Sequence, residues 1–359
     1  GLNAPVSERV TFAYTTALNY LLSDRKHHVR LGDTTVVYWA DKNDDACVEV
    51  MHDFLDARPR DSADAQGTES DPDQLVDDVM TKLARGLPLE GVDLDANFFV
   101  VGLAPNAARL SVRFFQRDTF GAVLDNLRRH YDRLDVARAP YEKKYLTPYR
   151  LLAETENPNA KQAAATSVLG GALMRSILGD LPYPEALYEN TILRVRATQD
   201  NDERHTRKVT RGRAAIIKAY LIKNCGKEVT VGLDENNESK SYALGRLFAV
   251  LEQTQEMAAW LDQQKLNATI GSRFFNSACA TPEAVFPTIM KLNQSHLDKL
   301  RKAGKDRCYA REIAKLCERI ETLPKRHTNR EQGEFILGYW CQRQTRFAGF
   351  QDSKEDQEA

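Results

Sequence analysis

The sequence contains no hydrophobic run that approaches the roughly 18 apolar residues of a membrane-spanning helix. It also begins without methionine and without the charged-then-apolar leader of a secretory signal. Its 6 cysteines are widely spaced and never form a C-x-x-C pair, a pattern typical of reduced thiols rather than of a disulfide framework. These absences predict a cytoplasmic protein with no membrane span.

The sequence also has almost no net charge: 50 Lys and Arg balance 51 Asp and Glu, which leaves −1. That balance excludes a uniformly basic, histone-like protein and a wholly acidic disordered chain. The charges are nevertheless segregated. Residues 41–95 carry 16 acidic and 5 basic residues, whereas basic residues outnumber acids by 10 to 5 in 109–150, 10 to 3 in 193–227 and 14 to 7 in 291–346. Such segregation indicates charged binding partners.

Familiar catalytic motifs are missing as well. The chain has no G-x-x-x-x-G-K-[ST] or G-x-G-x-x-G phosphate loop, no G-x-S-x-G elbow and no H-E-x-x-H zinc motif. Cys308, Cys317 and His327 match no zinc-module spacing, and the two cysteines are expected to be small core residues. No catalytic site can therefore be assigned from the sequence, and no cofactor or metal is expected.

One residue pair keeps an enzymatic alternative open. His52 and Asp53 form the His-Asp pair with which one class of metal-dependent nuclease begins. No further metal ligands stand nearby in the sequence, and metal binding needs several ligands placed together. An ordinary exposed pair on a helix is the favoured interpretation.

The hydrophobic pattern predicts an α+β protein, with a small mixed domain followed by helices. Strands are expected at 34–40, 97–103 and 109–117, the last two as a hairpin, and helices from Ser7, at 74–85 and at 119–134. Helices are also expected at 147–156, 160–178, 184–198, 211–224, 240–265, 269–279, 283–303, 306–321 and 330–346. The predicted divisions are a mixed domain at 1–140 with a flexible acidic loop at 58–74, a helical middle region with a basic loop at 141–234, a helical bundle at 235–347 and a disordered tail at 348–359.

The first candidate nucleic-acid surface is the predicted strand 109–117. Strict alternation places five residues on one face: Arg109, Ser111, Arg113, Phe115 and Arg117. Arginines beside an aromatic ring are what RNA-binding sheets use to contact phosphates and stack on bases. The alternative is a solvated face whose arginines pair with the acidic block.

The second candidate surface is a polar loop rich in Lys and Arg. Its basic residues are Arg204, Arg207, Lys208, Arg211 and Arg213, preceded by Arg194 and Arg196. Basic clusters on a loop suit a polyanion, since the release of condensed counterions drives such binding. The alternative is a charged loop that is merely solvated.

The third candidate is a stripe on the predicted helix 306–321. Arg307, Arg311, Lys315 and Arg319 are spaced by four, so they drift by only about 40° per step around a helix. The preceding helix and turn add Lys299, Arg301, Lys302 and Lys305. Two adjacent basic helices are expected to form a groove for single-stranded nucleic acid, unless Glu312 and Glu318 neutralise the stripe by pairing along the helix.

Several long stretches of the chain form a distinctive series. In chain order they are LNAPVSERVTFAYTTALNYLL, GDTTVVYWA, FFVVGLAPNAARLSVRFF, YLTPYRLLAETE, ALMRSILGDLPYPEALYENTILRVRA, YALGRLFAVLEQTQEMA, LNATIGSRFFNSACATPEAVFPTIMKLNQSHLDKL and FILGYWCQRQ. Together they resemble the large subunit of the subtype I-C CRISPR surveillance complex, Cascade. The resemblance runs from Leu2 to about Phe347. Family members carry a further N-terminal portion, so this chain resembles the C-terminal part, and the residues that read the protospacer-adjacent motif are expected outside it.

The resemblance implies a non-catalytic DNA-recognition role. Its implied partners are a guide-RNA ribonucleoprotein, target double-stranded DNA with its displaced strand, the backbone, RNA-end-binding and small subunits of Cascade, and a helicase–nuclease. It also implies that the helices after about residue 235 resemble the small subunit, whose bundles hold DNA by its backbone. A purely structural scaffold, whose basic faces meet acidic protein neighbours, remains the other alternative.

Overall fold

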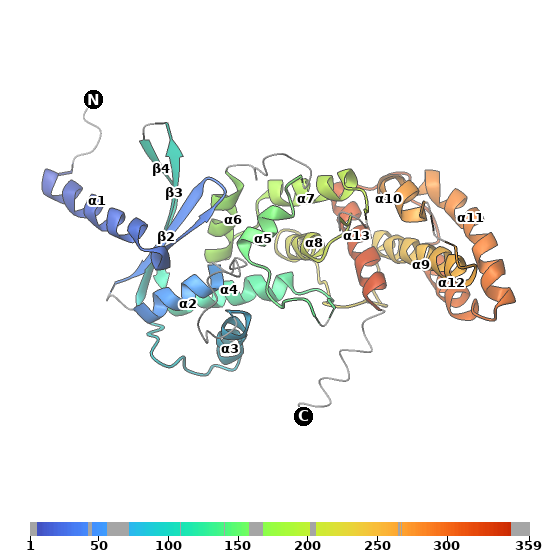
Figure 1. The fold of residues 1–359 in the computed structure, drawn as a ribbon, viewed down its shortest axis with the longest axis horizontal. Coiled ribbons are helices and arrows are strands. Elements are labelled where there is room, and N and C mark those ends of the chain that lie inside the picture. The colour runs from blue at the N-terminus through green and yellow to red at the C-terminus, as the bar shows by residue number, and fades with distance from the viewer. Residues whose placement is uncertain are drawn as a thin grey trace. The chain divides into compact units, whose positions relative to one another are not determined.

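The computed structural model describes residues 6–41, 45–55, 72–107, 109–139, 141–157, 168–201, 206–264, 266 and 268–345. The chain forms two compact units (Figure 1). The first comprises Gly1–Asp132 and Lys143–Leu187, and the second Arg133–Glu142 and Tyr188–Ala359. Among the described residues, no helix is both long enough and apolar enough to cross a membrane. The three-part domain division expected from the sequence stays a prediction.

The first unit is built on a four-stranded antiparallel sheet whose strands are neighbours in chain order. The strands are β1 (His28–Leu31), β2 (Thr34–Ala40), β3 (Asn97–Asn106) and β4 (Arg109–Thr119). The predicted strand 34–40 and the predicted hairpin are confirmed, with both hairpin strands longer than expected. β1 was not predicted, because four residues with one buried pair give little signal.

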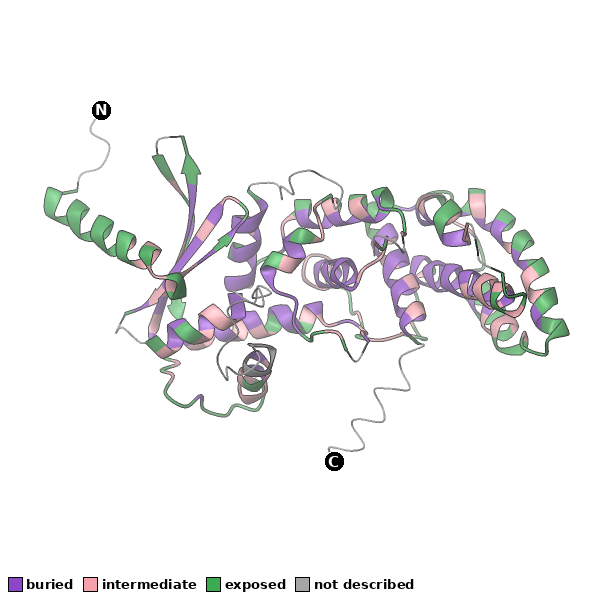
Figure 2. Ribbon diagram, in the orientation of Figure 1, coloured by how far each residue is buried: buried purple, intermediate pink, exposed green. Residues whose placement is uncertain are grey.

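Helices cover one face of this sheet. They are α2 (Asp45–Leu55), α4 (Phe120–Leu134) and α6 (Leu169–Leu178), with α3 (Pro72–Ala84) and α5 (Pro148–Ala153) beyond them. The predicted apolar side of α4 is buried, and its Phe120 ring lies 4.9 Å from that of Phe98. α1 (Glu8–Ser23), capped by Ser7 as expected, has no buried residue and is exposed over most of its length (Figure 2).

The second unit is helical, and α9 is its centre. It contains α8 (Arg211–Lys223), α9 (Lys240–Leu261), α10 (Ile270–Ala280), α11 (Pro282–Lys302), α12 (Arg307–Ile320) and α13 (Asn329–Gln344), and receives most of α7 (Glu185–Ala197). The first half of α9 is buried on every side (Figure 2). Gly245 permits this packing, since a Cβ there would overlap the carbonyl of Phe335 on α13. Phe248, Phe275 and Phe335 fill the core with edge-to-face contacts.

The α+β class and the helix pattern expected from the sequence are confirmed. Several boundaries differ. The helix expected at 160–178 is described only from Leu169, and the one expected at 240–265 ends at Leu261. α3 begins at Pro72, inside the predicted loop 58–74. Proline is well suited to the first turn of a helix, where its missing N–H is not needed. Residues 58–71 of that loop and the predicted tail 348–359 lie outside the described residues.

Candidate nucleic-acid interface

A row of three cations lies along the exposed face of α12. Arg307, Arg311 and Lys315 are exposed, and within the described parts of the chain none of the three forms an ion pair. The opposite face of α12 buries Ile313, Leu316 and Ile320 against the unit. This amphipathic arrangement fixes the orientation of the helix and therefore the direction in which the row points. We call Arg307, Arg311 and Lys315 the α12 row.

The acid expected to neutralise the row points elsewhere. Glu312 forms a 2.6 Å ion pair with Arg246 of α9, whose side chain is only 4 % exposed. Burial makes Arg246 dependent on this partner, because an unpaired charge in the interior is costly. Glu318 is exposed and forms no ion pair with a described residue. Neutralisation of the row through Glu312 is therefore wrong.

The cations at the end of α11 have mixed surroundings. Lys299 pairs with Asp262 at 2.5 Å, and Arg301 pairs with Asp298 and Asp306. Lys302 is exposed. Arg319, the fourth residue of the predicted stripe, donates to the backbone carbonyls of Glu235 and Asn237. The stripe thus divides into exposed cations and cations that hold the local structure together.

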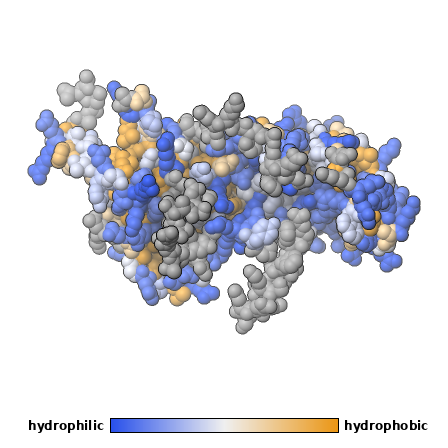
Figure 3. All heavy atoms as spheres, viewed as in Figure 1, coloured by the Kyte–Doolittle hydropathy of each residue, from blue (hydrophilic) through white to orange (hydrophobic). Residues whose placement is uncertain are grey.

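An exposed tryptophan stands beside these cations. Trp260, at the end of α9, is 66 % exposed, and the Lys305 ammonium lies 4.8 Å from its ring centroid. Sequence reasoning missed Trp260, because it belongs to an otherwise apolar helical pattern. Its signal was a large aromatic next to the polar run that ends the helix. An exposed ring with a cation nearby is a platform on which a nucleobase can stack. The end of the second unit that carries α11 and α12 is largely hydrophilic, with smaller hydrophobic areas among the hydrophilic ones (Figure 3).

The predicted basic loop is largely interior. Lys208, Arg211 and Arg213 are 3 %, 7 % and 4 % exposed, whereas Arg207 is exposed and Arg204 lies outside the described residues. Arg213 donates to the carbonyl oxygens of Arg207 and Lys208, so it fixes the shape of the loop. Burial lowers the pKa of Lys208, whose ammonium donates to Asn276. This burial favours a structural role for Lys208 and Arg213, and strand binding by the loop stays a prediction.

The alternation expected for the strand 109–117 is interrupted. Gly102 of β3 pairs with Phe114 and the next residue, Leu103, with Val112, so Arg113 is an extra residue in β4, a β-bulge. Arg113 instead pairs with Asp33 at 3.2 Å. The prediction of a single face for all five residues is wrong, because the bulge shifts the alternation by one position. Phe115 and Arg117 share a face, whereas Arg109 and Ser111 lie on the opposite one.

The face that carries Phe115 and Arg117 bears a row of aromatic rings. Trp39 and Phe99 stack at 5.3 Å, and Phe99 lies 6.4 Å from Phe115. The Arg117 guanidinium lies 5.6 Å from the Phe99 centroid. Since the stacked rings turn their faces toward one another, the α12 row with Trp260 offers the more accessible cationic and aromatic surface.

The residues of the enzymatic alternative have structural contacts. His52 Nδ1 lies 3.0 Å from the Tyr38 hydroxyl, beneath the sheet. Within the described part of the chain, no group of three or more His, Cys, Asp and Glu side chains is placed to hold a metal ion. Cys308 and Cys317, expected in the core, are exposed on α12, which is a correction. Both lie off the narrow apolar face formed by Ile313, Leu316 and Ile320.

Comparison with known proteins gives a family for nearly the whole chain. The model of a family described as "CRISPR-associated protein (Cas_Csd1)" matches residues 1–347. No curated protein matches the chain. The matched range covers both compact units and includes the α12 row and Trp260.

Proposed function

Because the chain belongs to the CRISPR-associated Cas_Csd1 family, we propose that it is the large, non-catalytic subunit of a subtype I-C Cascade complex. In this role it acts in the cytoplasm with the guide-RNA ribonucleoprotein and the other Cascade subunits. It helps the complex to open target double-stranded DNA, stabilises the displaced strand and presents the resulting R-loop to a helicase–nuclease. The family and the long stretches resembling that subunit support this assignment.

One observation carries the DNA-binding part of the proposal. The α12 row presents three exposed cations without ion-pair partners among the described residues, and Trp260 stands exposed at the adjoining end of α9. Successive cations are about 6 Å apart along the helix axis. Cations without protein partners contact phosphates irrespective of sequence, and an exposed indole stacks on any base. This surface suits a displaced single strand whose sequence varies from target to target.

A small binding energy is sufficient for this role. Exchange of a DNA duplex for an RNA–DNA heteroduplex is nearly balanced, so protein contacts to the strands decide whether the R-loop persists. Each phosphate neutralised on a single strand contributes about 0.7 to the slope of log affinity against log salt concentration. The α12 row would then supply a slope of about 2 on its own.

Charge reversal of the row tests the proposal. The double variant Arg311→Glu/Lys315→Glu is expected to bind a preformed R-loop more weakly, with a salt slope lower by about 1.4. The matched control is Lys325→Glu/Arg326→Glu, which changes the charge equally at two other exposed cations of the second unit. Fluorescence anisotropy of a labelled R-loop at several salt concentrations measures both quantities with the full chain.

Three outcomes would contradict the proposal. Equal losses in the control variant would mean that only overall charge matters. Unchanged R-loop binding with failed assembly of the complex would show that the row meets an acidic protein, as in the scaffold alternative. Magnesium-dependent DNA cleavage that is lost in His52→Ala would contradict the non-catalytic assignment.

A further inference from the structure

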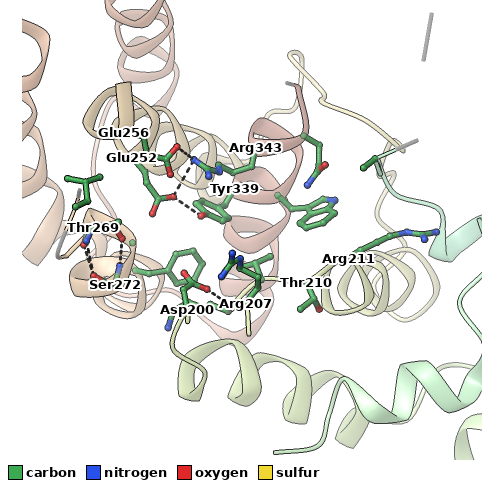
Figure 4. A pocket seen from close by; sticks show the side chains of 18 of the residues that line it. Asp200, Arg207, Thr210, Arg211, Glu252, Glu256, Thr269, Ser272, Tyr339 and Arg343 are labelled. Atoms are coloured by element: carbon green, nitrogen blue, oxygen red, sulfur yellow. Dashed lines mark hydrogen bonds and ion pairs between the residues drawn. The ribbon is translucent and has the colours of Figure 1, made fainter. Parts of the chain in front are cut away.

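A cavity of 690 Å³ lies within the second unit, on the side of α9 that faces α8, α10 and α13 (Figure 4). Its walls come from the loop before α8, from α9, from the N-terminus of α10 and from the end of α13. Cavities of this size are typical of small-molecule sites. Nothing in the DNA-binding role of the α12 row requires it.

One wall of the cavity is cationic. Arg207, Lys208 and Arg211 line it, and Arg211 is the first residue of α8. The side chain of Thr210 caps that helix by accepting from the amide of Arg213. The positive end of the helix dipole therefore adds to the side chains of Arg207 and Arg211, whereas the Lys208 ammonium is bound to Asn276. This combination favours an anionic group, above all a phosphate.

The acids on the facing wall are already satisfied. Tyr339 donates to Glu252 Oε2 at 2.7 Å, and Arg343 pairs with Glu256 Oε2 at 2.8 Å. Burial raises the pKa of Glu252, so its charge is reduced where it faces the cavity. Gly271 leaves room for this carboxyl group, because a Cβ there would overlap Glu252 Oε1. Asp200 and Glu142 also line the cavity, and each accepts from a backbone amide, that of Lys208 at 2.6 Å and that of Ala139 at 2.9 Å. The lining thus holds four acids, each with a donor, and four cations, three of which are gathered at the start of α8.

Two aromatic residues and one unpaired acceptor also line the cavity. Tyr141 and Trp340 line the cavity, and Tyr141 is 83 % exposed at its rim. The side chain of Gln344 also lines it, and its Oε1 is buried without a hydrogen-bond partner in the described structure. A buried acceptor that lacks a donor is costly. A ligand that brings an N–H group into the cavity would remove that cost.

We propose that this cavity binds a nucleoside phosphate, with its phosphate at the cationic wall and its base among the aromatic residues, donating an N–H to Gln344. Two sources of this ligand share the chemistry: a free nucleotide and one nucleotide of a bound strand. Glu256 of the cavity and Trp260 are four residues apart on α9, so they lie on one side of the helix. The second source rests on the proposed function, whereas the first does not.

Calorimetric titration of the full chain with deoxyadenosine monophosphate, adenosine and inorganic phosphate tests the site. Saturable binding of the monophosphate is expected, with adenosine at least about tenfold weaker because it lacks the charged group. Arg207→Glu is expected to weaken monophosphate binding at least about tenfold. The matched control is Arg194→Glu, a half-buried cation of α7 that does not line the cavity, and it should leave binding unchanged.

Gln344→Leu separates recognition of the base from attraction of the phosphate. It should weaken monophosphate binding at least about threefold and leave binding of inorganic phosphate unaltered. Circular dichroism and thermal melting confirm that each variant is folded. Lack of saturable binding, or equal losses in Arg207→Glu and Arg194→Glu, would overturn the proposal.

A single-stranded oligonucleotide provides the second arm. If the strand supplies the nucleotide, the oligonucleotide competes with the monophosphate, and an abasic oligonucleotide competes at least about tenfold less well. If the monophosphate fails to bind the cavity while oligonucleotide binding still depends on Arg311 and Lys315, that result would overturn this inference and leave the proposed function intact. Monophosphate binding without competition by the oligonucleotide supports the cavity and assigns it to free nucleotides.

Discussion

Arg246 of α9 and Glu312 of α12 form a 2.6 Å ion pair whose guanidinium is almost wholly buried. Arg246 also donates to Gln342 of α13, so one side chain connects three helices of the second unit. The pair holds Glu312 away from the α12 row, which leaves the row cationic. Stability and surface charge of this helix therefore depend on the same contact.

Glu312→Gln is expected to destabilise the protein by about 3 kcal/mol, because it leaves the buried Arg246 without its counter-charge. Glu318→Gln is the matched control, since Glu318 is exposed on the same helix, and it should change stability by less than about 0.5 kcal/mol. Urea denaturation followed by circular dichroism measures both. Equal stability of the two variants would contradict the structural role of the pair.

Gly245→Ala is expected to cost about 3 kcal/mol, because the added Cβ would overlap the carbonyl of Phe335 and push α13 away from α9. Gly232→Ala is the control: a Cβ there meets nothing within 4 Å, so the stability should be unchanged or slightly higher. The change in thermal midpoint distinguishes them. A tolerated Gly245→Ala would mean that the two helices do not pack this closely.

The pH dependence of stability should carry a contribution from His327. Burial lowers the pKa of His327 below its ordinary value, despite the nearby Glu331 and Glu334, and its ring bonds to Cys279 O and Ser241 Oγ. The unfolded chain therefore binds the proton more tightly than the folded one. This contribution is present above about pH 6.5 and is lost as the pH falls through the lowered value.

His327→Asn should accordingly flatten the dependence of the thermal midpoint on pH between about 7.5 and 5.5. Asparagine does not titrate and can still donate to the carbonyl of Cys279. The variant is expected to be less stable at every pH because its shorter side chain gives up the contact with Ser241, but the slope is the measured quantity. An unchanged slope would show that other groups control acid destabilisation.

Trp260→Ala is expected to weaken binding of a single-stranded oligonucleotide by about 1–3 kcal/mol, the usual contribution of one base stacked on an aromatic ring. Trp260→Phe should retain most of the affinity. Leu292→Ala, at another exposed apolar residue of the second unit, is the control and should have no effect. Equal affinities of the alanine variants and the parent chain would show that no base stacks at Trp260.

Periodic patterns predicted much of the fold. The apolar repeat predicted the helix at 119–134, which is α4, and the helix at 306–321, which is α12. Both predictions succeed because burial of a helix face repeats every three to four residues, and the sequence records that repeat directly.

Single-residue events and the roles of cations were harder to predict. One extra residue at Arg113 leaves the composition of β4 unchanged, so alternation alone could not reveal it. Lys208 and Arg213 look like binding residues in the sequence, yet they are enclosed by the structure. The sequence pattern of lysines and arginines does not distinguish a cation that is hydrogen-bonded to the backbone from one that is accessible to a ligand.

The bulge at Arg113 also gives the hairpin tip a preferred side. Leu110 and Val112 are 54 % and 61 % exposed and lie on the same face as Phe115. They do so only because the bulge inserts one extra residue between them and Phe115. Without that extra residue they would point to the opposite side of the sheet from Phe115, and Arg109 would take their place beside it. Deleting one residue would thus exchange the two faces of the hairpin tip, so that a charged edge would replace the apolar edge beside Phe115.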